Sequence, residues 1–443
     1  MGSATGRMQR TSLLLLLLGA SISILWGISL ERGSRAGVMG FPGVYLGTKC
    51  LLQHGDPYNV EQMQKVYDSA GLTVPSQSAA LRQSATLYVN LPTTFLFVAP
   101  FALLPLGVAQ TAWLILTISC FILGAFLMWR LGNSYSPGVS VFLAFIVLAN
   151  CEVIFSGGNT AGLVVGLCVI AAWCFLQERL VGVGVVCLAI ALAIKPHDAG
   201  PLWFYFLLAG HRHTKRALQS GLLTLALAGI AFVWVSDVAP NWLPEFRANL
   251  AIISARGGIN EPGPLSIGVG SPDMIIDLQT FVSVLTDDPH IYNPITYAVC
   301  ALLLGVWSFV VLRSKQSVQK AWFALVSVMS LSMLVTYHRS YDARLLLLSI
   351  PACCMLWAEG GAIGWIAFVL SAAAIVFTAD IPLALLTHAT RDLYSPTGSI
   401  LAKLGVSVVA RPAPLILLAI AIFYLFVFAR RDRSAETLPA SST

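Results

Sequence analysis

The chain has 443 residues, of which 57% are hydrophobic and 10% are charged, and its formal net charge is +6. With so few polar side chains and a mean hydropathy of +0.80, a chain of this length cannot cover the surface of a soluble globule. The composition therefore predicts an all-α, multi-pass protein whose first partner is the lipid bilayer. The basic residues form no block interleaved with aromatic residues, so no nucleic-acid partner is expected.

The first predicted element is an apolar stretch at residues 12–30, which follows Arg7 and Arg10. At 1.5 Å per residue, this stretch can cross a hydrocarbon core of ~30 Å. A cleavable signal peptide has the same basic and leucine-rich pattern, but no clean small-x-small cleavage site follows the leucines. We therefore predict an uncleaved transmembrane helix, with a signal peptide as the alternative.

Basic residues cluster at the N-terminus and at residues 212–216, 313–320 and 430–433. By the positive-inside rule these four places are cytoplasmic. Residues 31–90 and 237–290 then become two outer loops of more than fifty residues each. Loops of that length are usually functional or disordered.

Six apolar runs lie between the first outer loop and residues 212–216, although an odd number of crossings is required there. One run must be re-entrant or two must merge, and the short, proline-broken run at residues 91–105 is the favoured candidate. The whole chain then has about twelve transmembrane helices. We predict a single transmembrane domain at residues 1–430 and a disordered cytoplasmic tail at residues 431–443.

Three polar groups interrupt the apolar runs, at residues 157–159, 195–198 and 337–342. Ionisable side chains at the end of a membrane segment are costly, so by default they line a cavity and serve function. Under the predicted topology all three groups face outward, together with the two long loops. The candidate binding residues are Asn159, Lys195, His197, Asp198, His338, Arg339, Tyr341 and Asp342.

The first outer loop begins with apolar residues at helical spacing over residues 41–52. This spacing predicts a short amphipathic helix lying along the membrane surface. The Gly-Asp-Pro sequence at residues 55–57 then stops the helix. A Tyr-x-x-x-Pro motif at residues 88–92 and an Ala-Pro-x-x-Leu-Leu-Pro motif at residues 99–105 follow.

In this order, and with the Lys-Pro pair at a helix end, these features resemble the polyprenol-phosphate-sugar-dependent glycosyltransferases of family 87, which have the GT-C fold. The resemblance covers roughly residues 12–345. It implies an enzyme that moves a hexose, mannose-like, from a polyprenyl-phosphate carrier to an extracytoplasmic acceptor such as an envelope glycan or glycolipid. It implies no cofactor, and a location in a bacterial inner (cell) membrane with both termini in the cytoplasm.

The resemblance also implies a general base in the first outer loop that takes the proton of the acceptor hydroxyl. In the family this Asp stands directly before the Phe or Leu of the short helix, where this chain has Gly40 before Phe41. Three explanations stay open: Asp56 or Glu31 replaces the base, the alignment is displaced, or only binding is retained. Asp56 is the candidate catalytic residue because its turn follows the short helix directly.

Lys195 suits a lipid-linked phosphate, because a cation at the membrane edge attracts the anion and His197 can add a hydrogen bond. The structural alternative is a lysine that snorkels to the interface and pairs with Asp198. His338 and Arg339 could hold phosphate or sugar hydroxyls, with Tyr341 beside them.

Asp342 would orient one of these groups, unless residues 338–342 form only a juxtamembrane salt-bridge cluster. Asn159 could bind a sugar hydroxyl, although Gly-Gly-Asn is also ordinary turn chemistry. We assign no metal ligands, because the sequence has no Asp-x-Asp pair and no Cys/His ligand spacing, and a catalytic divalent metal stays an open alternative. The alternative functions are a transporter or flippase for a lipid or small solute, and a catalytically silent membrane scaffold.

Overall fold

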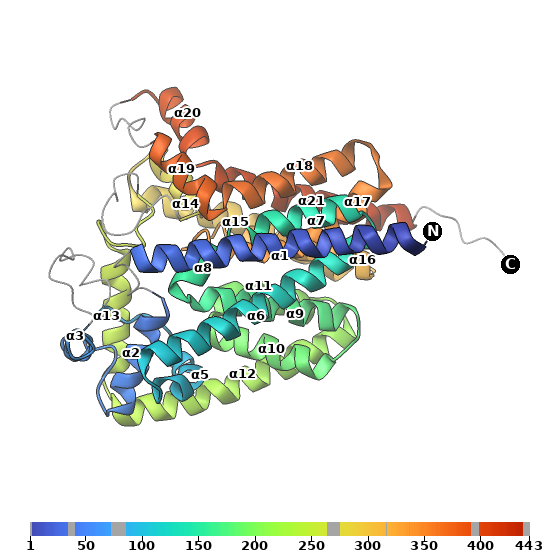
Figure 1. Cartoon of the computed structure of the whole chain (residues 1–443). Helices are drawn as coiled ribbons and strands as arrows, with labels where there is room; N and C mark the ends of the chain where they lie inside the picture. The colour runs from blue at the N-terminus through green and yellow to red at the C-terminus, as the bar shows by residue number, and fades with distance from the viewer. Residues whose placement is uncertain are drawn as a thin grey trace.

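The structure, a computed structural model, describes residues 2–33, 40–71, 86–263, 275–315, 317–335, 337–390 and 398–436. Within these ranges the chain folds into helices and forms no strand (Figure 1). The predicted all-α fold is confirmed. Most of the longer helices run side by side along one direction, and shorter helices gather at one end.

Among the described residues, five helices are long and apolar enough to cross a membrane. The shortest has 25 residues and therefore spans about 38 Å, which exceeds a hydrocarbon core of ~30 Å. Leu222, Leu225 and Val233 are exposed on one of them, as suits contact with lipid chains. A polytopic membrane protein is confirmed, and about twelve spans stays a prediction. The five are α1 (Gly2–Gly33), α6 (Leu106–Asn133), α12 (His211–Val238), α15 (Pro289–Arg313) and α21 (Pro412–Glu436).

A second set of helices fills the interior. Of these, α9 (Thr160–Leu176) is the most central, because it is buried at every residue except Trp173. It packs between α6 and α10 (Val181–Ile194). The others are α7 (Pro137–Leu148), α8 (Glu152–Gly157), α11 (Pro196–Leu208), α16 (Val318–Ser332), the 3₁₀ helix η2 (Asp342–Leu348) and α17 (Ser349–Glu359). By contrast, α18 (Gly361–Phe377) packs on this set with one face and is exposed on the other.

The short helices of the two predicted outer loops lie at one end of the molecule, on the left in Figure 1. The amino end of α1 and the carboxyl end of α21 lie at the opposite end, together with the start of α12. The basic clusters and the long loops are therefore at opposite ends, as predicted. The first loop carries α2 (Phe41–Leu52) and α3 (Val60–Ser69), and the second carries α13 (Trp242–Ser254) and α14 (Leu278–Leu285).

Three further helices at this end refine the predicted topology. The first, α5 (Thr93–Ala102), is only about 15 Å long, which agrees with a run at residues 91–105 that does not cross the membrane. The other two, α19 (Asp380–Thr390) and α20 (Ile400–Ala410), were not assigned from the sequence. At the opposite end, α21 continues to Glu436, so part of the predicted tail is helical, whereas residues 437–443 lie outside the described residues.

The two outer loops are joined to each other by hydrogen bonds between the first loop and α13. The amide of Asn249 donates to the backbone oxygens of Tyr58 and Tyr88, at 2.9 and 3.1 Å. Asn59 donates to Glu245 at 3.1 Å. Because these bonds join residues more than 150 positions apart, the loops form one layer over the end of the helix bundle.

The bounds of α2 match the predicted short helix, but its environment does not. Nine of its twelve residues are buried, against α3, α5 and α6, so it has no open apolar face to lay on lipid. Phe41 stacks on Trp113 at 5.1 Å between ring centroids. The amphipathic interpretation was wrong, because the residues between the apolar ones are small (Gly43, Gly47, Thr48) and permit burial on nearly every side.

We expect Gly166→Val to destabilise the bundle, because a side chain at position 166 would meet the backbone carbonyl carbon of Cys120 at 2.7 Å. Overpacking of this kind costs about 1–3 kcal/mol, and thermal unfolding of the purified protein in detergent would measure it. Gly305→Val is the matched control, since position 305 lies in a helix with open space around it. Equal melting temperatures for the two variants would contradict the close approach of α6 and α9.

Candidate functional site

Lys195 lies at the junction of two interior helices, where α10 ends and α11 begins. Its backbone leaves the helical region, with φ −146° and ψ 78°. Pro196 follows at the first position of α11, where its missing N–H costs nothing. Asp198 lies in the first turn of the same helix, where a negative charge is favourable. The Lys-Pro-His-Asp sequence therefore creates a break that places three polar side chains at one point.

The segment at residues 337–342 reaches the same point and is held there by the second outer loop. The backbone N–H of Ile276 donates to His338 O at 2.9 Å. The guanidinium of Arg339 donates to the backbone oxygen of Ile259 and to Asn260 Oδ1. The Arg339 side chain thus holds the loop, in addition to any part it takes in binding.

The centre of the site is the ammonium group of Lys195. It forms ion pairs with Asp198, at 3.0 Å, and with Asp342. It also lies 5.1 Å from the ring centroid of Tyr341, within range of a cation–π interaction. Both carboxylates are fully buried, whereas 11% of the lysine side chain is exposed. The structure thus brings together the two polar clusters, as predicted.

Two histidines complete this cluster on the other side of Asp198. Asp198 Oδ1 lies 3.4 Å from His338 Nε2 and 3.7 Å from His197 Nε2. The centroids of the two imidazole rings are 5.2 Å apart. His338 is buried, but 40% of the His197 side chain is exposed. The cluster is therefore accessible from the side of His197.

The same three residues also have the spacing of a metal site. His197, Asp198 and His338 each offer one ligand atom within 4.8 Å of the others, the one such group among the described residues. Ligand atoms around a tetrahedral zinc lie ~3.3 Å apart for bonds of ~2.0 Å, so a divalent cation fits the donor set. The ammonium of Lys195, which forms an ion pair with Asp198, would repel a second cation there. The residues thus fit a metal chemically, and the predicted absence of a metal stays a prediction.

A second buried charge network lies two residues further along the chain. Arg344 pairs with Asp380 at 2.8 Å, and Asp380 also accepts a hydrogen bond from the N–H of Val153. Glu152 lies within electrostatic range of both charged groups and is buried. Arg344 and Asp380 were missed from the sequence. An arginine at the very start of the apolar run at residues 344–358 was the signal that could have revealed this network.

Asp56 lies in the turn after α2, on the outer loops. It accepts a hydrogen bond from the N–H of Tyr58 at 2.9 Å, and burial together with the charge of Glu245 raises its pKa. Within the described ranges, no hydrogen bond or ion pair joins it to Lys195. A chain of contacts connects the two regions indirectly, because Tyr58 donates to Asn90 O and the hydroxyl of Thr93 donates to Ala193 O.

Asn159 has a clear structural task at the start of α9. Its Oδ1 accepts the N–H of Ala161 at 2.9 Å and caps the helix. Gly158 before it adopts a left-handed conformation with φ 58°, and its oxygen accepts a hydrogen bond from Trp113. The turn chemistry expected of Gly-Gly-Asn is present. Whether Asn159 also binds a sugar stays a prediction.

Position 40 has no room for a side chain. Gly40 has a φ of 120°, and an added Cβ would lie 2.2 Å from Gly157 O. The start of α2 is thus pressed against the end of α8. With this backbone an aspartate cannot stand at position 40, so the chain differs from the expected family pattern in its packing as well as in its residue type.

A helix bundle with exposed apolar sides, buried charge clusters and two long loops over one end defines a polytopic membrane protein with a polar site at that end. The model of glycosyltransferase family 87 matches residues 88–337, more than half of the chain. The protein therefore belongs to this family of membrane glycosyltransferases. The match includes Asn159 and residues 195–198, but not Gly40, Asp56 or residues 338–342.

No curated protein and no solved structure matches the chain. The family match is therefore the comparison that bears on activity, and the roles of individual residues are argued from their geometry.

We expect Gly40→Asp to destabilise the protein rather than to supply a base, because of the clash with Gly157 O and the left-handed backbone. The melting temperature should fall and glycosyl transfer should not increase. Gly107→Asp is the control, since it adds the same charge where no atom lies within 4 Å of the new Cβ. A well-folded Gly40→Asp protein with raised transfer would show that position 40 is a vacated base site.

Proposed function

We propose that the protein transfers a mannose-like hexose from a polyprenyl-phosphate carrier to a hydroxyl of an envelope glycan or glycolipid. The reaction takes place on the outer face of a bacterial cell membrane, with both termini in the cytoplasm. It needs no nucleotide site, because the leaving group is the lipid phosphate. The observation that carries the proposal is the Lys195 ammonium, held in the family-matched region where the two polar clusters meet.

Lys195 is suited to hold the phosphate of the donor. An ammonium group has three N–H donors. Asp342 accepts one of them, and Asp198 forms an ion pair with the ammonium at 3.0 Å. Another N–H can donate to a phosphate oxygen on the open side of the cluster. His197, which is partly exposed at that side, can donate a second hydrogen bond. The two carboxylates fix the lysine in place and also weaken its net attraction for an anion, so its role is positioning as much as charge.

Asp56 is our candidate for the general base. In the proposed step the acceptor oxygen bonds to the anomeric carbon while the bond from that carbon to the phosphate oxygen breaks. The hydroxyl proton passes to Asp56, and the polyprenyl phosphate leaves with the bonding electrons. The raised pKa of Asp56 suits this task, because a base with a higher pKa holds the proton better.

In membranes supplied with labelled polyprenyl-phosphate hexose, Lys195→Ala should lower kcat/KM by about 10- to 100-fold, as expected for the loss of one hydrogen bond to a charged group. Lys65→Ala, an exposed lysine at the same end, is the control and should transfer normally. Because Lys195→Ala leaves two buried carboxylates without their cation, the double variant Lys195→Gln with Asp342→Asn tests the same contact in an uncharged pair.

Transfer at the wild-type rate by these variants would place the phosphate elsewhere. If the wild type transfers no sugar from any donor, a transporter or a silent scaffold becomes the better explanation of the site.

The pH dependence tests the base. Asp56 must be ionised to accept a proton, and its pKa is raised from the usual 3.8, so activity should fall on the acid side at a higher pH than for an ordinary Asp. Glu245→Gln removes the neighbouring negative charge, lowers the pKa of Asp56 and should shift this limb to lower pH. Profiles of kcat/KM against pH measure the shift. If Glu245→Gln leaves the acid side of the pH profile unchanged and Asp56→Asn is still active, Asp56 is not the general base.

A further inference from the structure

A cavity of about 380 Å³ lies at the opposite end of the bundle from the Lys195 cluster. α11 connects the two places, because Lys195 stands at its start and Ala209 at its end, about 20 Å apart along the helix. The cavity therefore lies outside the proposed transfer site, and its volume is that of a small-molecule site. Its lining consists of Leu176, Glu178, Tyr205, Ala209, Gly210, Arg212, His213, Ser317, Val318 and Ala321.

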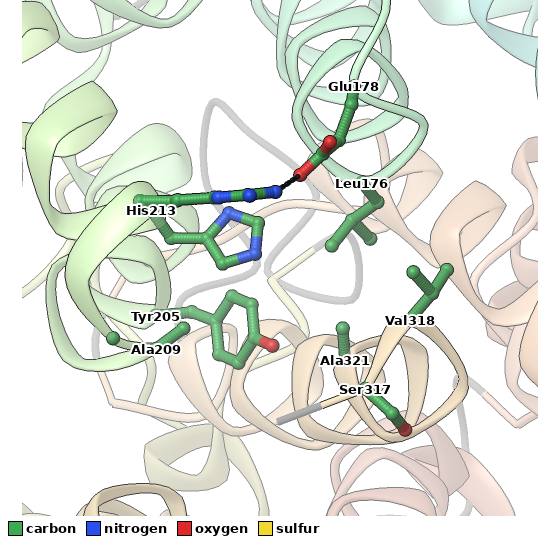
Figure 2. A pocket seen from close by; sticks show the side chains of 10 residues that line it. Leu176, Glu178, Tyr205, Ala209, His213, Ser317, Val318 and Ala321 are labelled. Atoms are coloured by element: carbon green, nitrogen blue, oxygen red, sulfur yellow. Dashed lines mark hydrogen bonds and ion pairs between the residues drawn. The ribbon is translucent and has the colours of Figure 1, made fainter. Parts of the chain in front are cut away.

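Most of the cavity wall is apolar. Figure 2 shows Leu176, Val318 and Ala321 on one side of the opening, with Tyr205 and His213 facing them from the other. The residues lie at the ends of four helices, α9, α11, α12 and α16, and in the turns that adjoin them. An apolar wall of this kind suits hydrocarbon and does not suit a small hydrophilic ion on its own.

The rim carries more positive than negative charge. Arg212 pairs with Glu178 at 2.9 Å, the contact drawn in Figure 2, and Arg216 lies 3.8 Å from the same carboxylate. One acid therefore faces two guanidinium groups. The side chains of Arg212 and Glu178 are exposed over 75% and 53% of their area, so their ion pair contributes little and a stronger anion can replace the carboxylate.

His213 and the start of α12 add donors at the same place. His213 Nδ1 is buried and has no hydrogen-bond partner among the described residues. The helix begins after Gly210, which lines the cavity and offers no side-chain cap to the first N–H groups. Two backbone oxygens at the neighbouring helix ends are already bonded, Phe175 O to Arg216 and Leu207 O to Thr214. The polar part of the cavity thus offers mainly donors.

We propose that this cavity binds an anionic phospholipid. Its phosphate lies at Arg212, His213 and the first turn of α12, and the first carbons of an acyl chain lie along Leu176, Val318 and Ala321. A lipid fits better than free phosphate, because the wall is apolar and the basic end of the molecule adjoins a membrane surface. The site is independent of the proposed transfer reaction and can be tested without an acceptor.

Purified full-length protein in detergent would be titrated with phosphatidylglycerol, phosphatidylcholine and inorganic phosphate, and followed by native mass spectrometry and thermal unfolding. Phosphatidylglycerol should bind in preference and raise the melting temperature. Arg212→Ala and His213→Ala should each weaken binding about fivefold. Lys215→Ala is the matched control, because it removes a charge from the same turn without lining the cavity.

Val318→Trp provides a second variant that changes no charge. Val318 is 46% exposed, so the larger side chain can fill the opening without repacking the core, and bound lipid should be lost. Equal binding of phosphatidylcholine would overturn the anionic preference. The same stabilisation by inorganic phosphate alone would make this a free-phosphate site, and an equal loss in Lys215→Ala would reduce it to non-specific surface attraction.

Discussion

The ion pairs of Lys195 with Asp198 and Asp342 are the interaction on which the outer end of the molecule depends. Lys195 and Asp342 are 147 residues apart, and their contact joins the α10–α11 junction to the segment before η2. Taking such charges out of water costs several kcal/mol per ion, so each must be compensated by partners in a fixed geometry. The second outer loop is in turn bonded to that segment through His338 and Arg339. The loop's position therefore follows from the buried pairs.

The same segment carries the second network, since Arg344 follows Asp342 by two residues. Through Asp380 it fixes the start of α19, and the bond from Val153 to Asp380 fixes α8. The end of α8 in turn presses on Gly40 at the start of α2. The absence of a carboxylate at position 40 is thus part of the packing. Restoring one would require α8 and the charges behind it to move.

Local chemistry in the sequence was sufficient to predict helices and their ends. The bounds of α2, the break at Lys195-Pro196 and the stop after residue 52 follow from apolar spacing and from proline and glycine. The joining of residues 195–198 to residues 338–342 was predicted from topology alone, by counting crossings. The partner of a given charge could not be predicted, because Arg344 and Asp380 meet only after the chain has folded. The burial of α2 was missed for a similar reason: helical spacing describes one helix and not its neighbours.

In the reaction proposed above, Asp56 and the phosphate held by Lys195 stand on opposite sides of the anomeric carbon, as a single displacement on a sugar requires. The base contacts the acceptor hydroxyl on one side of the anomeric carbon, and the phosphate leaves from the other, so the sugar ring must stand between them. Where a reactant has to fit between two carboxyl groups, as in inverting glycoside hydrolysis, those groups lie ~6.5–9.5 Å apart. A direct ion pair between Asp56 and Lys195 would close this space. The hydrogen bonds from Tyr58 to Asn90 and from Thr93 to Ala193 link the two regions through the start of α5 and the residues just before it.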